Sequence, residues 1–202
     1  MIDHILLDVI GAIREAFGGA LLEQQAVEER FQVDVFLGDL SFETSYSLPG
    51  EGNPARVRAD LTLDWPTWSQ SAYRSWSIGE APAEPPELIV ELAFRLQHLV
   101  GAPDHGKVLS VLDADGPQIG AERLERVAPT LEQCFDGLAE PTCALEVAYQ
   151  GSLRLEDAVL EEPSKLDTQI AGLARWVASA LVRLADLHLE FRPPEEDNAP
   201  PS

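Results

Sequence analysis

Basic residues are scarce in this sequence. Its 202 residues include 14 Lys and Arg against 35 Asp and Glu, which gives a formal net charge of −21 at pH 7. A surface this negative repels phosphate groups, which argues against direct binding to nucleic acid or to an anionic membrane as the main activity. The same charge attracts basic proteins, many of which bind nucleic acid. Two interpretations stay open: the acidity only maintains solubility, or it also attracts a basic partner.

Cysteine and long apolar runs are scarce as well. Cys134 and Cys143 are too few for a disulfide framework and match no zinc spacing, which favours two small core side chains. No uninterrupted apolar run approaches the roughly 20 residues that span a bilayer. Residues 1–17 carry acidic side chains and no basic start, unlike a signal peptide. Together these features predict a cytoplasmic protein.

The motifs of common enzyme classes are also missing. There is no glycine-rich phosphate loop and no GxSxG nucleophile motif. None of the four histidines is spaced from another histidine or from a carboxylate pair as a metal site requires. Residues 111–122 partly match a calcium loop, but Val111 and Gln118 occupy positions that need a ligand and an apolar residue. We therefore predict no metal, no cofactor and no catalytic residue.

Hydrophobic periodicity predicts an α+β fold. Apolar residues recur at three- and four-residue steps over 2–17, which predicts an amphipathic helix ended by Gly18-Gly19. Segments 31–37, 40–48 and 56–63 then alternate apolar and polar residues and are joined by short links. This pattern is typical of an antiparallel meander with one buried and one solvated face.

Three of the four tryptophans lie in the stretch DWPTWSQSAYRSW. On a helix, Trp65, Trp68 and Trp76 fall on one side, and Gly79 provides a stop signal. The pattern predicts a short helix at 65–78 that lays its tryptophans on the sheet. Core packing is the favoured interpretation, and an aromatic platform for a ligand is the alternative.

The second half of the chain predicts further helices and strands. The expected elements are a central helix at 87–100, a strand at 107–116, a helix at 120–137 interrupted by Pro129, a hairpin at 142–160 turning near Gln150-Gly151, and a final helix from 164 to about 190. Residues 1–191 are expected to form a single α+β domain, in which an antiparallel sheet packs against amphipathic helices. Residues 192–202 predict a disordered acidic tail. The order of elements in 1–100 and 107–191 suggests two similar halves, without a repeat at the level of residues.

The final helix carries more apolar surface than one sheet face requires. Its apolar residues span roughly 160°, where about 100° is enough to cover a sheet. The surplus edge holds Trp176, Ala180 and Leu187. It either packs on another helix of the same chain or forms a dimer contact or a client groove. Phe36, on the solvated side of its strand, is a second candidate for a partner surface, and the tryptophan cluster with Trp68 and Trp76 is a third.

The order of these elements resembles a known family. The segments that carry the resemblance are ILLDVIGAIREAF, FQVDVFL, LSFETSYSL, RVRADLTL, ELIVELAFRLQHLV, ALEVAYQGSLRLE and IAGLARWVASALVRLADL. In their order, over most of the chain, the sequence resembles the type III secretion chaperone fold and the related YbjN-like family. The resemblance implies a small acidic protein, usually a dimer, that binds other proteins without chemistry. The helices expected at 66–78 and 120–137 depart from that fold, so no functional residue is carried over.

We therefore predict a chaperone or adaptor that is not an enzyme, forms a homodimer, and binds a basic client, which could itself bind DNA. Apolar docking would give affinity, and the acidic surface would accelerate association. The main alternative is a small-molecule-binding protein or enzyme that uses the loops at 104–115, where His105, Asp113 and Asp115 would line a pocket. A structural subunit of a larger assembly is a third possibility.

Overall fold

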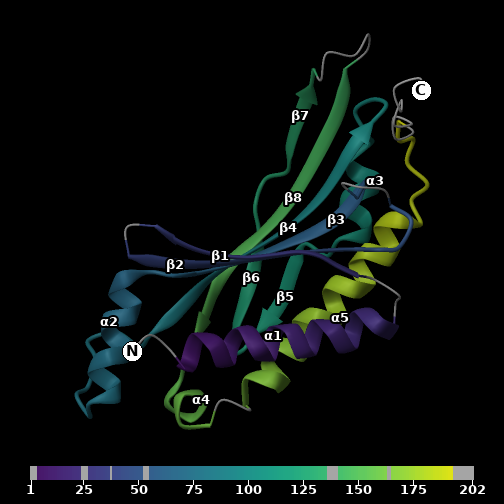
Figure 1. Cartoon of the computed structure of the whole chain (residues 1–202). Helices are drawn as coiled ribbons and strands as arrows, with labels where there is room; N and C mark the ends of the chain where they lie inside the picture. Colours follow the sequence, from purple (N-terminus) through teal and green to yellow (C-terminus); the bar gives the residue numbers. More distant parts are fainter. Residues whose placement is uncertain are drawn as a thin grey trace, which may run out of the picture.

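The computed structural model describes residues 4–23, 27–36, 38–51, 55–135, 141–162 and 165–192. Apart from Arg192, the tail predicted at 192–202 lies outside the described residues. Within these ranges the chain is an α+β protein with one open, antiparallel sheet of eight strands (Figure 1). The elements are α1 (His4–Glu23), β1 (Val27–Phe36), β2 (Asp39–Ser47), β3 (Val57–Trp65), α2 (Thr67–Ser77), β4 (Glu87–Leu99), α3 (His105–Val111), β5 (Asp115–Ile119), β6 (Glu122–Arg126), β7 (Thr130–Cys134), β8 (Thr142–Arg154), α4 (Asp157–Glu161) and α5 (Lys165–Ala185).

The strands are ordered β1-β2-β3-β4-β8-β6-β5, and β7 pairs with β8 beside β6. The predicted meander is confirmed: β1, β2 and β3 pair antiparallel in sequence, and Gly38 turns between the first two with a φ of 94°. The sheet is strongly twisted, so that β1 and β2 run across the view while β7 and β8 rise steeply (Figure 1).

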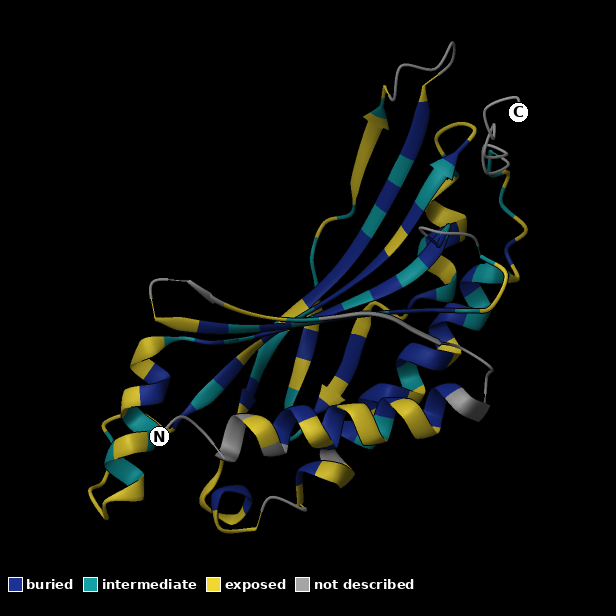
Figure 2. Cartoon of the chain, viewed as in Figure 1, coloured by how far each residue is buried: buried dark blue, intermediate teal, exposed yellow. Residues whose placement is uncertain are grey.

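Helices α1 and α5 lie side by side on one face of this sheet. In α1, Val9, Ile13, Phe17 and Leu21 recur every fourth residue and are all buried. This stripe continues past Gly18-Gly19, so α1 extends to Glu23 instead of ending at the glycine pair. Residues from both predicted halves, 1–100 and 107–191, contribute to the same sheet and to one hydrophobic core (Figure 2).

The helix predicted at 87–100 is wrong, because these residues form the central strand β4. Its buried side chains alternate along the strand: Leu88, Val90, Leu92, Phe94 and Leu96 all face the helices. The intervening residues point to the other face, where Ala93 lies opposite Ala148 of β8 and both are shielded by longer neighbours. These additional apolar residues conceal the period of two and give the sequence a helical appearance.

The hairpin predicted at 142–160 is also wrong. Strand β8 runs without a turn through Gln150 and Gly151, and pairs with β4 over almost all of its length. A Cβ at Gly151 would lie 2.9 Å from Cδ2 and 3.4 Å from Cα of Leu124 in β6, so the glycine leaves room for β6 to approach. In this strand, Gly151 allows close packing and does not mark a turn.

Two further expectations between residues 104 and 137 are corrected. The strand predicted at 107–116 is helical up to Val111, in α3, and only its last two residues belong to a strand, β5. The Asp104 carboxylate caps the N-terminus of α3 at 2.9 Å from the Gly106 nitrogen. The helix predicted at 120–137 is instead the strands β6 and β7, which Pro129 separates. The helix predicted at 65–78 is confirmed as α2 only from Thr67 to Ser77, because Trp65 is the last residue of β3. The final helix predicted from 164 to about 190 is confirmed as α5, although it ends at Ala185. In the described part of the chain, no helix combines the length and apolar character needed to cross a bilayer.

Candidate protein-binding surfaces

The surplus edge of α5 lies against the protein's own core. Ala180 is fully buried and Leu187 is 9% exposed. Trp176 is half-buried, and its ring centroid lies 5.6 Å from that of Phe94 and 5.2 Å from that of Tyr149. The three residues singled out on this helix therefore contribute little exposed apolar surface in the single chain.

Trp176 and Tyr149 also fix the loop that follows α3. The Trp176 indole Nε1 donates to Oδ2 of Asp113 at 3.1 Å, and the Tyr149 hydroxyl donates to the Asp113 carbonyl at 2.8 Å. Burial raises the pKa of Tyr149 above its ordinary value, with Arg126 opposing the shift. The raised pKa keeps this phenol protonated, so it remains the donor that holds the loop.

The residues predicted for a small-molecule site come together only in part. Asp113, Asp115 and Trp176 line an open depression of about 520 Å³, whereas His105 lies at the start of α3 and does not line it. Asp104 is occupied as the helix cap, and Asp113 accepts from the Trp176 indole. Within the described ranges, no three His, Cys, Asp or Glu side chains are grouped so that they could hold a metal ion.

Helix α2 divides the tryptophan cluster between core and surface. Trp65 is buried in the core, and Trp76 is half-buried and stacks on Tyr73 at a centroid distance of 6.0 Å. By contrast, Trp68 is 43% exposed and Ile78 is 71% exposed. We call this exposed pair, Trp68 and Ile78, the α2 surface. The Phe36 side chain lies outside the described residues.

Polar contacts hold α2 against the end of the sheet. Ser69 is buried; its hydroxyl donates to the Glu87 carbonyl at 2.6 Å and accepts from the Glu87 nitrogen at 2.8 Å. The side-chain nitrogen of Gln70 donates to the carbonyls of Gly38 at 2.9 Å and Trp65 at 2.8 Å. Sequence reasoning missed Ser69 and Gln70, because buried polar residues in a helix have no apolar pattern. These bonds present Trp68 from a fixed support.

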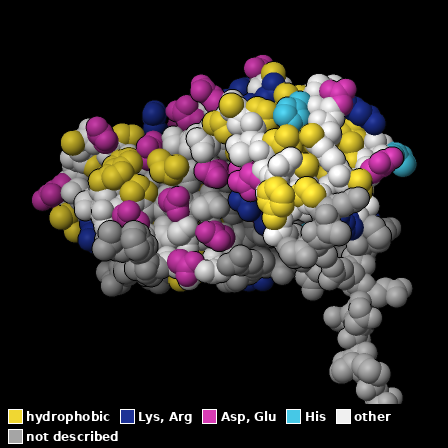
Figure 3. All heavy atoms as spheres, turned by 90° about the horizontal axis from the view of Figure 1, so that it is seen from above, with side chains coloured by type: hydrophobic (Ala, Val, Ile, Leu, Met, Phe, Trp, Pro, Cys, Tyr) yellow, Lys and Arg dark blue, Asp and Glu magenta, His cyan; other side chains and the backbone are white. Residues whose placement is uncertain are grey.

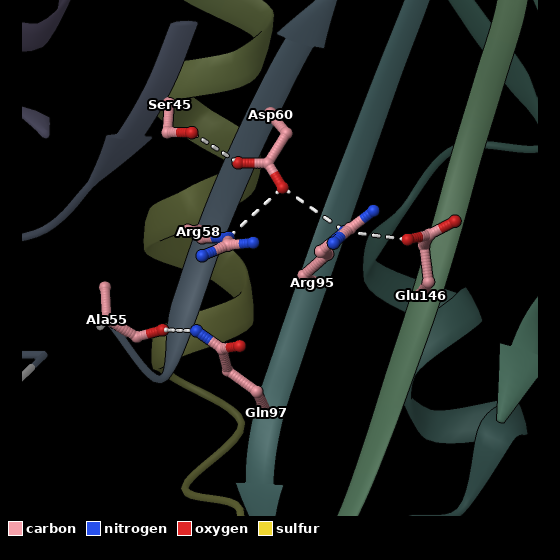
Figure 4. A network of polar contacts seen from close by, with 7 residues as sticks. All are labelled: Ser45, Ala55, Arg58, Asp60, Arg95, Gln97 and Glu146. Atoms are coloured by element: carbon pink, nitrogen blue, oxygen red, sulfur yellow. Dashed lines mark hydrogen bonds and ion pairs between the residues drawn. The ribbon is translucent and has the colours of Figure 1, made fainter. Parts of the chain in front are cut away.

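A second surface is the face of the sheet opposite α1 and α5, which carries a network of charges (Figure 4). The Ser45 hydroxyl donates to Oδ1 of Asp60 at 2.6 Å, and Nε of Arg58 donates to Oδ2 at 3.1 Å. Nε of Arg95 lies 3.2 Å from the same Asp60 oxygen and 2.7 Å from Oε2 of Glu146. Two arginines and two carboxylates thus compensate each other across β3, β4 and β8, and Ser45 of β2 joins the network. Partly exposed ion pairs add little stability, so their main effect is to fix where charge lies.

Further apolar side chains are exposed near the N-terminal end of β8. Strand β7 pairs there with β8, and Phe135 just beyond it is 74% exposed, while Leu131 is 39% exposed. A hollow of about 280 Å³ on the face beside β7 is lined mainly by polar residues, among them Arg95, Glu132 and Glu146. Seen from above, apolar side chains gather in two groups, one at each side of the view, with acidic side chains between them (Figure 3).

These surfaces are the features of the molecule that bear on its function. No family model, curated protein or solved structure matches this chain.

Proposed function

We propose that this protein is a cytoplasmic, non-enzymatic chaperone or adaptor that holds a basic client protein. The observation that carries the proposal is the α2 surface, where Trp68 on the helix and Ile78 just after it remain exposed, and buried hydrogen bonds fix the helix. Tryptophan on a rigid support is the kind of residue that dominates binding energy at protein interfaces. A client that itself binds nucleic acid fits the required charge.

The net charge of −21 supports the choice of a basic client. Long-range attraction raises the rate of association, whereas apolar burial slows dissociation. The complex is therefore expected to form more slowly as salt increases and to retain a salt-tolerant affinity.

The resemblance to type III secretion chaperones and YbjN-like proteins is part of this proposal. Its support is the first helix, the three-stranded meander and the closing helix, which the chain has in the order on which the resemblance is based. The segments at 87–99 and 142–154 are single strands instead of a helix and a hairpin. The support from the order of elements therefore comes from the first third and the last helix of the chain.

The α2 surface is tested by affinity capture with the double variant Trp68→Ser/Ile78→Ser as bait. Losing an exposed tryptophan anchor is expected to reduce the recovery of basic proteins about tenfold or more relative to the unaltered chain. Quantitative mass spectrometry of the captured proteins provides the measurement. Leu7→Ser is the matched control, because Leu7 is 64% exposed but lies on α1.

Equal recovery with the double variant and with the unaltered chain would show that the α2 surface does not hold the client. Equal losses with the double variant and with Leu7→Ser would instead indicate non-specific apolar adsorption. Both results contradict the proposal.

The proposal includes a homodimer. In the described part of the chain, β1 pairs with β2 alone, so its other edge offers backbone donors and acceptors to a second copy. Light scattering of the purified chain is expected to give a mass twice the 22.1 kDa of one copy. A mass of one copy at all concentrations would remove the dimer from the proposal without affecting client binding.

Small-molecule binding is the second candidate function. The observation that favours it is the depression beside Asp113, Asp115 and Trp176. Ligand sites usually enclose most of their ligand, and this depression is open. The geometry therefore supports the adaptor more strongly.

A further inference from the structure

One face of the sheet is without a helical cover in the described residues. Helices α1, α3 and α5 pack on the other face and on each other. The outward side chains of β2, β3, β4 and β8 are mostly polar and at least partly exposed, and the largest apolar exception is Ile89 at 39%. An uncovered face on a sheet of seven strands in a row, with β7 beside β6, offers a broad docking surface.

Strand pairing places a row of carboxylates across this face. Glu43 pairs with Thr62, Thr62 with Glu91, Glu91 with Gln150, and Gln150 with Glu125. Directly paired residues share a face, so Glu43, Glu91 and Glu125 form a transverse row with a neutral residue between neighbours. Since strands lie about 4.8 Å apart, successive carboxylates of the row are spaced by roughly 10 Å. We call these three residues the acidic row.

The acidic row is not neutralised within the described residues. None of its three carboxylates forms an ion pair there, and Glu91 accepts a hydrogen bond only from the neutral amide of Gln150, at 2.9 Å. Arg58 and Arg95, on the same face, are already engaged by Asp60 and Glu146. The row therefore offers its charge to a partner.

The end of the row carries an electrostatic conflict. Glu125 of β6 pairs directly with Asp115 of β5, and both residues are exposed. Like charges directly opposite on neighbouring strands destabilise a sheet. A cation bound at this position would relieve the repulsion, which is a reason independent of net charge to expect a positively charged occupant.

Three occupants are disfavoured by the geometry. A single metal ion cannot bridge carboxylates roughly 10 Å apart, because its ligand distances are about 2–2.6 Å. Nucleic acid carries the same sign of charge as the row. A second copy of this chain would have to place basic side chains on the row, and only 14 of its 202 residues are Lys or Arg.

We propose that the acidic row binds a basic helix of the client protein, with Lys or Arg repeated at every seventh residue. A rise of 1.5 Å per residue separates positions i and i+7 by about 10.5 Å on nearly the same side of a helix, which matches the carboxylate spacing. An extended segment fits less well. It covers the same roughly 10 Å in three residues, and side chains three residues apart on a strand point to opposite sides, so only one of them would face the row. Because neighbouring strands are rotated relative to each other, the carboxylates do not lie on a straight line, and the long Lys and Arg side chains reach across this deviation.

This inference deepens the proposed function and rests on it. Ile89 lies on the same face as Glu91, two residues along β4 from Glu87, to which Ser69 of α2 is bonded. The α2 surface and the acidic row are thus linked at the start of β4. A basic helix lying along the row would therefore have Ile89 beside it, in the direction of α2.

The test uses the full chain and a synthetic helical peptide with Arg at i, i+7 and i+14. Its binding to the unaltered chain and to Glu43→Gln/Glu91→Gln/Glu125→Gln is measured by fluorescence anisotropy at low salt. The control variant, Glu15→Gln/Glu161→Gln/Glu190→Gln, changes three exposed carboxylates outside the uncovered face and has the same net charge. A control peptide of equal composition carries its Arg residues on three different sides of the helix.

The acidic-row variant is expected to weaken binding of the patterned peptide about tenfold, and the control variant about twofold or less. The patterned peptide should bind more tightly than the control peptide. Equal weakening in both variants would overturn the inference, since only net charge would then matter. Equal binding of the two peptides would also overturn the inference. The same holds if spermine displaces the patterned peptide and the control peptide equally well. Thermal unfolding of both variants shows that each is folded.

The inference and the proposed function fail in different ways. If the acidic-row variant captures clients normally while Trp68→Ser/Ile78→Ser loses them, the function stands and the row is not the docking site. If the peptide binds the row but neither variant affects capture, the row binds basic helices and the client proposal fails.

Discussion

Phe94→Ala is expected to lower the free energy of unfolding by about 3–5 kcal/mol. Phe94 is fully buried in β4, at the centre of the sheet between β3 and β8. Its ring lies edge-on to Tyr149 at 6.3 Å and tilted to Trp176 at 5.6 Å, so its removal leaves a cavity between the sheet and α5. The surrounding rings are held by hydrogen bonds to Asp113 and cannot readily fill that space.

Urea denaturation followed by circular dichroism measures this loss. Ile89→Ala is the matched control on the same strand, because Ile89 points to the uncovered face and is 39% exposed. Its expected effect is below about 1 kcal/mol. A loss at Ile89 as large as that at Phe94 would mean that another layer covers this face, and it would remove the surface proposed to bind a basic helix.

The first third of the fold could be predicted from the sequence because local patterns and tertiary structure agree there. In β3, Arg58, Asp60 and Thr62 alternate with buried apolar residues, which gives a period of two that a helix cannot satisfy. Gly38 supplies the positive φ that the short link between β1 and β2 requires, and Asp39 already pairs with Phe36 as the first residue of β2. The bonds that secure α2 had no such signal in the sequence.

The second half could not be predicted because tertiary pairing decides it. Strand β4 carries Ile89 and Ala93 on its outer face, so its apolar residues have no clear period. A strand between two others can tolerate this, but only the pairing with β3 and β8 shows that it does so. The sequence predicts a turn near Gly151, whereas in the structure this glycine leaves room for β6 to approach β8.

The candidate site was predictable only where one local segment builds it. The sequence predicts one helix for Trp65, Trp68 and Trp76 and so points to Trp68 of the α2 surface, but it does not reveal that Trp65 belongs to β3 and is buried. The acidic row could not be found in this way, because Glu43, Glu91 and Glu125 are far apart in the chain and meet only through strand register. The surplus apolar edge of α5 suggested a partner, yet Ala180 is fully buried in the chain's own core.

Gly116→Ala is expected to destabilise the protein by about 3 kcal/mol, at the upper end for a small overpacking change. A Cβ at this position would lie 2.1 Å from the carbonyl oxygen of Leu124 and 2.8 Å from a ring carbon of Tyr149. A backbone carbonyl inside a strand cannot move away as a flexible side chain can, so β5 would have to separate from β6.

The same substitution at Gly172 meets no atom within 4 Å, and it removes a glycine from the interior of α5. Gly172→Ala is therefore expected to stabilise the fold by about 0.5–1 kcal/mol, because alanine loses less backbone entropy in a helix. Opposite signs in parallel thermal unfolding experiments would establish that β5 closes tightly on β6 at Gly116, which positions Asp115 beside Glu125 at the end of the acidic row. Two small shifts of the same sign would instead place β5 away from β6, and the like-charge contact would no longer support a cationic partner.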